Sequence, residues 1–313
     1  MSSKINKSIS IVTPLFNEEH NVVELCERVA KVLAMLPYDY EHICIDNRSS
    51  DRTVELLKTI AKTDAHLKII INTRNFGYIR SSYHALLQSS GDAVILIASD
   101  LQDPPEMIIE FIKKWEAGYK TVMAIKPKSE EPFIMHQLRR IFYKIITRIS
   151  EVPLIQNATG SGLFDRTVIN ILRNLNEPYP YFRGLLCEIG FPIATVSFTQ
   201  PRRKRGVSSQ NFYSLYDIAL LGITKHTKIP LRIMVIFGFC MTIISSLVAL
   251  CYLLIKLFSW NYAIAQNTTV LISVLLFSSL QIFCIGILGE YVASIQTHVR
   301  NMPHTIELER INF

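Results

Sequence analysis

The sequence predicts an α/β domain with a mostly parallel sheet, followed by an interfacial helix and two transmembrane helices. Over residues 9–125, short apolar runs alternate with stretches of helical periodicity, which is typical of βαβ units. Further along, residues 233–255 and 268–288 carry no charged side chain and are long enough to cross a bilayer. The mean hydropathy of the 313-residue chain is positive, as expected if part of it lies in lipid.

The elements of the α/β part follow one another in a regular order. We expect strands at residues 9–13, 42–45, 67–72, 93–98 and 121–125, and helices between them at residues 22–36, 53–61, 80–88 and 107–115. The last of these helices should begin with Asp103 as N-cap, Pro104 at its first position and Glu106 closing a capping box. In such sheets, ligands bind beyond the carboxyl ends of the strands.

Polar, acid-bearing turns follow three of the expected strands, at residues 13–19, 46–51 and 99–102. Asp100 and Gln102 offer two side-chain oxygens at alternate positions and have no structural role in the pattern, so they are candidate ligands for Mg²⁺ or Mn²⁺. Asp51 is explained equally well as a plain helix cap, whereas Asp46 has no such explanation. The sequence contains no glycine-rich phosphate loop, which argues against dinucleotide and P-loop chemistry.

The cysteines and the charge narrow the class of protein further. The six cysteines have no paired spacing, so they predict neither a disulfide framework nor a zinc site and are typical of small apolar residues in a reducing cytoplasm. The net charge of +7 includes the basic run 202–205. Nucleic acid is one explanation for such a run, but its position just before the apolar segments favours lipid headgroups or substrate phosphates.

The flanks of the two apolar segments predict their orientation. Lys225, Lys228 and Arg232 precede the first segment and Arg300 follows the second, which puts both termini in the cytoplasm and makes the pair a hairpin. Residues 211–223 have apolar side chains at helical spacing and suit an interfacial helix. A signal peptide is not expected, because residues 1–8 lead directly into a strand.

Four motifs together resemble those of the family 2 inverting glycosyltransferases, which have a GT-A fold. They are Thr-Pro-Leu-Phe-Asn-Glu-Glu at 13–19, the segment 46–53, Arg-Asn-Phe-Gly at 74–77 and Asp-Leu-Gln-Asp-Pro-Pro-Glu at 100–106. The branch they are most similar to is the polyprenyl-phosphate glycosyltransferases, which include bactoprenol glucosyltransferases and dolichol-phosphate mannose synthase. The likeness extends through residues 288–291 into the two apolar segments and so covers nearly the whole chain.

The resemblance implies transfer of a sugar from a nucleotide diphosphate, most simply a UDP-sugar, to polyprenyl phosphate at the cytoplasmic face of the cell's inner membrane. It divides the chain into a GT-A catalytic domain (1–205), a juxtamembrane amphipathic region (206–230), a transmembrane hairpin (231–292) and a cytoplasmic tail (293–313). The partners it implies are the membrane, a possible second copy of the chain, a downstream flippase and a second glycosyltransferase, and no nucleic acid.

The resemblance also implies roles for single residues. The nucleotide sugar would be held by Pro14, Leu15, Asn17, Glu18, Asp46, Asn75 and Asp100. Asp100 and Gln102 would bind Mg²⁺ or Mn²⁺, while Lys126, Arg203 and Arg205 would meet the acceptor phosphate. Catalysis would rest on Asp100, Arg203 and Arg205. Because a phosphate acceptor is already ionised near neutral pH, we expect no side-chain base; the rival hypothesis assigns that role to Asp165 or Asp103.

Three positions depart from the family pattern. Ala98 stands where relatives usually carry the first acid of Asp-x-Asp, Ser161 stands in place of an acid sometimes assigned as a base, and Ser209 replaces a common lysine. Two other functions stay open beside the one that the resemblance implies. A processive polysaccharide synthase should carry a Gln-x-x-Arg-Trp motif and more membrane helices, which this sequence lacks. An inactive nucleotide-sugar-binding scaffold is suggested by Ala98 and Ser161.

Overall fold

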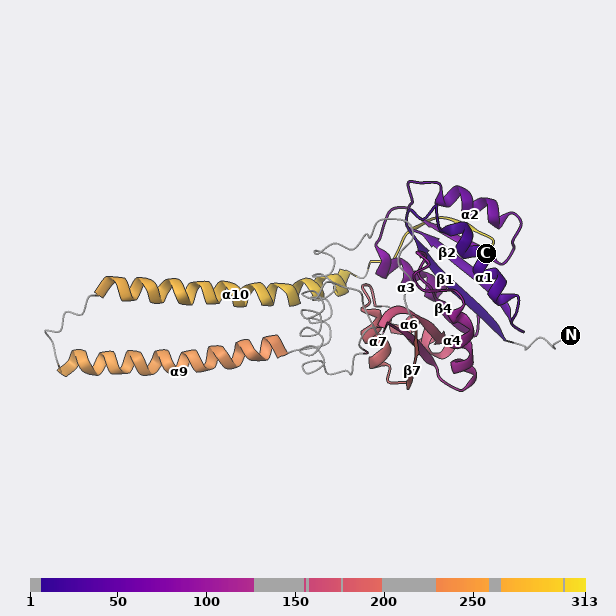
Figure 1. The fold of residues 1–313 in the computed structure, drawn as a ribbon. Coiled ribbons are helices and arrows are strands. Elements are labelled where there is room, and N and C mark those ends of the chain that lie inside the picture. The colour runs from indigo at the N-terminus through magenta and orange to yellow at the C-terminus, as the bar shows by residue number, and fades with distance from the viewer. Residues whose placement is uncertain are drawn as a thin grey trace.

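The chain folds into an α/β domain from which two long helices extend side by side (Figure 1). The computed structural model describes residues 7–126, 155, 158–175, 177–198, 229–258, 266–300 and 302–313. The strands are β1 (Ser8–Leu15), β2 (Asp39–Asp46), β3 (Leu67–Asn72), β4 (Ala93–Leu96), β5 (Thr121–Ile125), β6 (Ala158–Asp165), β7 (Ile193–Ser197) and β8 (Glu307–Ile311). The helices are α1 (Val22–Leu33), α2 (Thr53–Ala61), α3 (Tyr78–Gln88), α4 (Met107–Glu116), α6 (Arg166–Leu175), α7 (Phe182–Glu188), α9 (Ile229–Phe258) and α10 (Gln266–Arg300).

The eight strands of the described residues form one sheet, in the order β7-β5-β6-β4-β1-β2-β3-β8. Its centre, β4-β1-β2-β3, is parallel, while β6 runs antiparallel between β4 and β5, and β8 runs antiparallel along the edge of β3. The expected alternation of strands and helices over residues 9–125 is confirmed, as is the mostly parallel sheet. The carboxyl ends of β1, β2 and β4 consequently meet along one edge.

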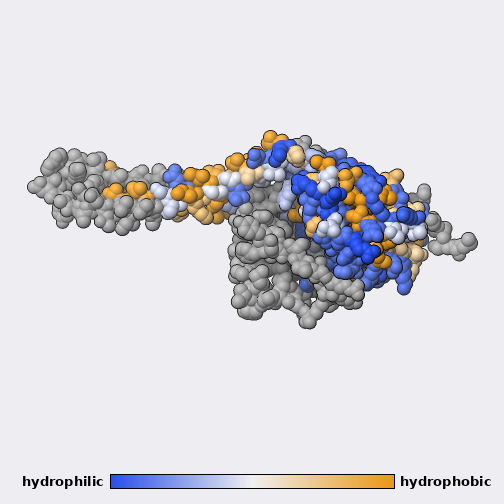
Figure 2. Space-filling model, turned by 90° about the horizontal axis from the view of Figure 1, so that it is seen from above, coloured by the Kyte–Doolittle hydropathy of each residue, from blue (hydrophilic) through white to orange (hydrophobic). Residues whose placement is uncertain are grey.

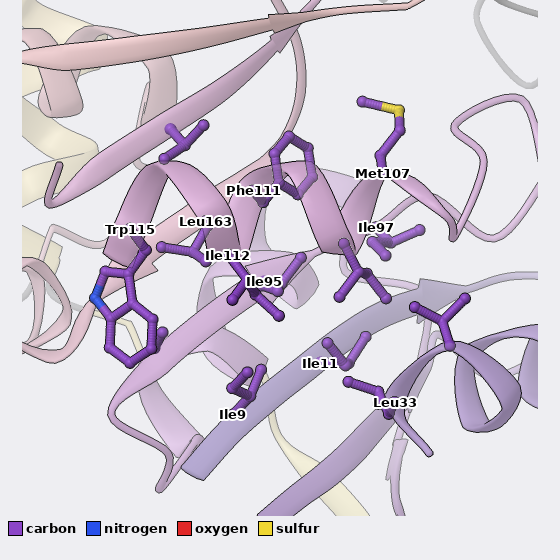
Figure 3. Close-up of a cluster of buried hydrophobic side chains, with 14 of the residues drawn as sticks. Ile9, Ile11, Leu33, Ile95, Ile97, Met107, Phe111, Ile112, Trp115 and Leu163 are labelled. Atoms are coloured by element: carbon purple, nitrogen blue, oxygen red, sulfur yellow. The ribbon is translucent and has the colours of Figure 1, made fainter. Parts of the chain in front are cut away.

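The central strands are apolar because helices cover both faces of the sheet. On one face, Ile9 and Ile11 of β1 and Ile95 of β4 pack against Phe111 and other apolar side chains of α4, as well as against α1 (Figure 3). The opposite face is covered by α3, α6 and α7. Each fully buried side chain of this size contributes about 1.5–3 kcal/mol to folding. This packing on both faces fixes where the strands end and therefore where the loops of the site begin.

The start of α4 differs from the prediction. The helix begins at Met107 with Glu106 as N-cap, and no side chain caps it. Asp103 is 5% exposed and accepts a hydrogen bond from Ser161 Oγ on β6. A buried carboxylate needs such a partner, so Asp103 is engaged by a distant strand and not by its own helix. The Glu106 carboxylate lies 2.7 Å from Arg28 of α1 in an ion pair.

The end of the chain returns to the sheet, which the sequence did not predict for the tail. After α10, β8 pairs with β3, and the Thr73 backbone N–H donates to Ile306 O at 2.9 Å. Arg80 of α3 donates to Pro303 O at 2.7 Å, and His84 lies 2.5 Å from the Glu307 carboxylate. The carboxyl-terminal segment thus ties α10 to the edge strand and to α3.

The apolar helices α9 and α10 span 30 and 35 residues and include the two segments predicted to cross the membrane. By length and composition, one stretch of the described residues qualifies as a membrane span, Phe277–Arg300, and the apolar stretch Ile229–Met241 is shorter. Apolar side chains lie exposed along the described parts of α9 and α10 (Figure 2). The basic run 202–205 and the predicted interfacial helix 211–223 lie outside the described residues.

Candidate active site

The turns after β1 and β2 are joined by hydrogen bonds through Asn17. Its backbone N–H donates to Ser49 Oγ at 2.9 Å, and its side-chain oxygen accepts from the Ser50 N–H at 2.8 Å. Asn17 has φ of 55°, a left-handed conformation that asparagine adopts more readily than most residues. The Glu18 N–H donates to Thr53 Oγ1 at 2.9 Å. The first two acid-bearing turns of the sequence therefore form one unit.

The two aspartates of the second turn both have structural partners. Asp46 is fully buried and accepts hydrogen bonds from the Ser49 N–H, at 2.9 Å, and from the Ser49 hydroxyl. Burial raises the pKa of Asp46, and these bonds only partly offset it. Burial acts in the same direction on Asp51, but hydrogen bonds from Thr53 and the Glu19 N–H outweigh it and lower the pKa of Asp51. Asp51 thus holds the start of α2.

A buried amide network supports the third loop, residues 74–77. The side-chain oxygen of Asn47, just past β2, accepts from Asn72 Nδ2 at 3.0 Å and from Ser81 Oγ at 2.5 Å. Within the loop, the Gly77 N–H donates to the Asn75 side chain at 2.8 Å. The Phe76 N–H also donates to the Asn47 side-chain oxygen, at 3.3 Å, so the network places the Arg-Asn-Phe-Gly motif beside the ends of β2 and β3.

The fourth turn holds the predicted metal ligands. Asp100 and Gln102 are half-buried, and Asp100 Oδ1 accepts from the Gln102 N–H at 3.1 Å. Leu101 between them has φ of 56°, so the turn is tight and left-handed. Burial raises the pKa of the neighbouring Asp103, the hydrogen bond from Ser161 lowers it, and the charge of Asp100 raises it again. The carboxylates of Asp100 and Asp103 are therefore close enough to interact.

Arg183 of α7 is a cation at this site that the sequence analysis did not single out. It donates from Nη2 to Thr159 O at 2.9 Å, which holds its guanidinium over the start of β6. A Cβ on the adjacent Gly160, which has φ of +104°, would lie 3.7 Å from Arg183 Nη2. Its charge lowers the pKa of Asp103, after the larger effects of burial and Ser161. Phe-Arg-Gly at 182–184 has no local pattern that would have marked it.

The predicted acceptor-phosphate residues fall partly within the described chain. Lys126 is half-buried and follows β5, which runs parallel to β4 because both are antiparallel to β6. It therefore lies at the same edge of the sheet as Asp100. Arg203 and Arg205 lie outside the described residues.

Asp165 is one of the two residues that the rival hypothesis assigns as a base. It lies beside the amino end of β4, at the opposite end of the strand from the candidate site. It pairs with Ala93 at the start of β4, whereas Asp100 follows the end of that strand. Its carboxylate accepts from Trp115 Nε1 at 2.8 Å and from the Thr167 N–H at 2.9 Å. Burial alone would raise the pKa of Asp165, but these bonds outweigh it and lower the pKa. A ligand at the carboxyl edge is therefore out of reach of this carboxylate.

Comparison with known proteins identifies the family of the chain. The family model described as glycosyl transferase family 2 matches residues 10–172. An uncharacterized glycosyltransferase of Synechocystis sp. is 30% identical over 94% of this chain and 93% of its own length. The SfII prophage-derived bactoprenol glucosyl transferase of Shigella flexneri is 31% identical over 95% of this chain and 96% of its own. Glucosyl-3-phosphoglycerate synthase from Mycobacterium tuberculosis, solved with Mn²⁺, UDP-glucose and phosphoglyceric acid, is 19% identical, with a TM-score of 0.46 over 71% of this chain and 79% of that one. The chain belongs to glycosyl transferase family 2.

Proposed function

We propose that this glycosyltransferase moves a sugar from a UDP-sugar to a polyprenyl phosphate, with inversion at the anomeric carbon, at the cytoplasmic face of the plasma membrane. The observation that carries the proposal is the meeting of four polar turns at one edge of the sheet, including Asn17, Asp46 and Asp100. Relatives named bactoprenol glucosyl transferase, which match over nearly the full chain, support the lipid acceptor.

The donor nucleotide is assigned to the joined turns after β1 and β2. Pro14 and Leu15 end β1, and Asn17 and Glu18 follow it. Asp46 ends β2, and Asn75 lies in the loop after β3. Hydrogen bonds already fix the backbone of these turns, so little conformational entropy is lost on binding a base and ribose. The buried Asp46 acts by holding Ser49 in place as well as by any direct contact.

The turn after β4 fits a hard divalent cation, Mg²⁺ or Mn²⁺. Asp100 and Gln102 supply a carboxylate and an amide oxygen on a half-exposed turn, which suits a cation that keeps several waters and diphosphate oxygens. When bound, the cation would neutralise the charge that develops on the leaving diphosphate. Asp103 next to this turn is already engaged by Ser161, so it keeps the turn in shape.

The acceptor phosphate is assigned to the cationic part of the same edge. Lys126 and Arg183 lie there within the described chain, and we add Arg203 and Arg205 from the basic run. A phosphate monoester is largely a dianion at neutral pH because its second ionisation falls near pH 6. The chain therefore needs to orient an oxygen that is already ionised, which guanidinium and ammonium groups do. The remote position of Asp165 agrees with a mechanism that uses no side-chain base.

The membrane part of the proposal is a two-helix anchor formed by α9 and α10. Both helices are apolar and expose large hydrophobic side chains, and basic residues flank the pair at Arg232 and Arg300. A sugar attached to a lipid phosphate at the cytoplasmic face must be carried across the bilayer before use outside. We therefore also propose a flippase and a second glycosyltransferase as downstream partners. Separately, we propose that the chain works as a homo-oligomer.

A transfer assay with the detergent-solubilised full chain tests this function. Radiolabelled UDP-sugar and polyprenyl phosphate should give a lipid-extractable product that contains one sugar, only when a divalent cation is present. A labelled polymer would instead identify a processive synthase. Binding of nucleotide sugars, seen as a thermal shift across a panel of them, without any transfer would identify the inactive scaffold that Ala98 and Ser161 suggest.

A further inference from the structure

Three side chains with metal-ligating atoms converge in the core beneath the candidate active site. Cys26 of α1 meets His42 and Cys44 of β2, and their ligand atoms all lie within 4.8 Å of one another. His42 and Cys44 are two residues apart on a strand, so both point to the face of the sheet that α1 covers. All three residues are buried. The spacing of the cysteines in the sequence did not predict this, because the cluster joins two separate elements.

The separations within the cluster suit a tetrahedral ion. Cys44 Sγ lies 3.6 Å from His42 Nε2. A tetrahedral zinc ion with ordinary bonds to sulfur and nitrogen holds those two atoms about 3.5 Å apart. Thr13 of β1 places its Oγ1 3.0 Å from the same nitrogen and offers an oxygen as fourth ligand. The cluster of two sulfurs and one nitrogen thus has an oxygen beside its nitrogen.

The charges also suit a soft divalent cation in a buried position. Burial lowers the pKa of His42 to about 4, so the imidazole is neutral at pH 7, which is the form that binds metals. Burial raises the pKa of the Cys44 thiol well above its usual range, so without a cation this thiol stays protonated. A divalent ion that displaces the two thiol protons leaves a neutral assembly, which avoids the cost of a buried net charge.

We propose that Cys26, His42 and Cys44, with Thr13, form a structural zinc site. The ion would bind β1, β2 and α1 together directly behind the nucleotide turns, because Thr13 precedes Pro14 and Cys44 lies two residues before Asp46. It is distinct from the proposed catalytic cation, whose ligands at Asp100 and Gln102 are oxygens on a half-exposed turn. Closed sites of this kind contribute to folding and take no part in chemistry.

Metal analysis of the detergent-purified full chain tests the site. After dialysis against zinc-free buffer that contains Mg²⁺, the wild-type chain should retain about one zinc ion, as expected for a closed site. Cys44→Ser and Cys26→Ser should lose it. Cys187→Ser, which alters a cysteine outside the cluster, and Asp100→Asn, which alters the proposed catalytic site, should both keep it. These experiments measure bound metal, so their outcome does not depend on the outcome of the transfer assay.

A second measurement covers the case in which the cysteine variants fail to fold. Wild-type protein produced with Co²⁺ in place of zinc should show the intense near-ultraviolet absorption of thiolate-to-cobalt charge transfer, and the Asp100→Asn variant should show it equally. Wild-type protein that carries no zinc and shows no such band overturns the proposal. Zinc retained undiminished in a folded Cys44→Ser variant overturns it as well.

Discussion

Ser161 Oγ on β6 donates a hydrogen bond to the buried carboxylate of Asp103 at 2.5 Å. The two residues are 58 positions apart, and their bond links the turn that holds Asp100 to the strand that carries Arg183's partner Thr159. The position at which the family resemblance leads one to expect an acid is therefore occupied here by a donor to a second acid. In this chain, the Ser161 hydroxyl holds Asp103 in place. A carboxylate at position 161 would instead repel Asp103.

The first prediction concerns the stability that this bond supplies. A carboxyl whose pKa is raised in the folded state costs stability as the pH rises from the unfolded value of about 3.9 toward the folded one. Ser161→Ala removes a bond that favours the charged form, so it should raise the pKa of Asp103 further and cost about 1–3 kcal/mol near pH 7. The loss should be smaller near pH 4.

Thermal unfolding of the solubilised protein at the two pH values measures this difference. Thr59→Ala on the exposed surface of α2 is the matched control and should change little at either pH. An equal loss at both pH values would mean that Ser161 supports packing and not the charge of Asp103.

The second prediction concerns Asp100. Asp100→Asn keeps the size of the side chain but removes the charge that would hold the catalytic cation. We expect divalent-dependent transfer to fall by a factor on the order of hundreds, because charge neutralisation at the diphosphate supplies several kcal/mol. Rates measured against cation concentration test this. Unchanged turnover, or turnover in the wild type that needs no divalent ion, would show that Asp100 is not a ligand.

The third prediction concerns Arg183. Its guanidinium is held at the site by Thr159 O, so Arg183→Ala should weaken use of the lipid phosphate about tenfold to a hundredfold, which is the usual worth of one or two charged hydrogen bonds. Arg183→Lys should recover part of this loss. The matched control is Arg173→Ala on the exposed side of α6. The test is the rate of transfer measured at varied concentrations of polyprenyl phosphate and of UDP-sugar. A rise confined to the KM for the UDP-sugar would contradict the assignment of Arg183 to the acceptor phosphate.

Contacts between residues close in the sequence can be predicted from it, whereas contacts between distant residues depend on the fold. The alternation of apolar strands with amphipathic helices predicted the sheet, and the polar turns after β1, β2 and β4 were correctly expected at one edge. These are local patterns. The Asp103–Ser161 bond and the convergence of Cys26 with His42 join segments that only the fold brings together. A sequence pattern at either residue alone contains no sign of its partner, so the local pattern at Asp103 predicts a helix cap.

The fourth prediction concerns the carboxyl-terminal strand. Burial alone would raise the pKa of Glu307, but hydrogen bonds from Arg310 and His84 outweigh it and lower the pKa. A lowered pKa means that Glu307 stabilises the fold above the unfolded value of about 4.3, and that this contribution disappears as the pH falls through the folded value. Glu307→Gln should therefore cost about 1 kcal/mol near pH 7, and this cost should begin to shrink near pH 4 and continue to shrink as the pH falls further.

The control for this strand is Glu309→Gln on β8, because Glu309 pairs with Lys58 at a more exposed position. Its effect on the unfolding temperature should be smaller at pH 7. Removal of residues 302–313 should lower the unfolding temperature more than either substitution, since it exposes the edge of β3 and deprives Arg80 of its contact with Pro303 O. A truncated chain as stable as the full one would show that β8 does not contribute to the fold.

The fifth prediction is that transfer needs no side-chain base. With an acceptor already ionised above about pH 6, the rate should show a single acidic limb near that pH and a plateau above it. Asp165→Asn should cost much less than Arg203→Ala, because Asp165 lies at the far edge of the sheet and Arg203 is proposed to position the acceptor. Both variants are compared at saturating UDP-sugar with varied polyprenyl phosphate.

Asp103 is the remaining rival for a base, and the same experiment separates it from a structural role. If Asp103 only shapes the turn, Asp103→Asn should leave stability and transfer close to those of the wild type, because the neutral amide can still accept the hydrogen bond from Ser161 and avoids the cost of a buried charge. The pH at which the acidic limb falls should not move, because it belongs to the acceptor. If Asp103 is a base, the variant should stay folded and bind UDP-sugar normally while transfer is abolished at every pH. That result, or the same result for Asp165→Asn, would rule out the base-free mechanism.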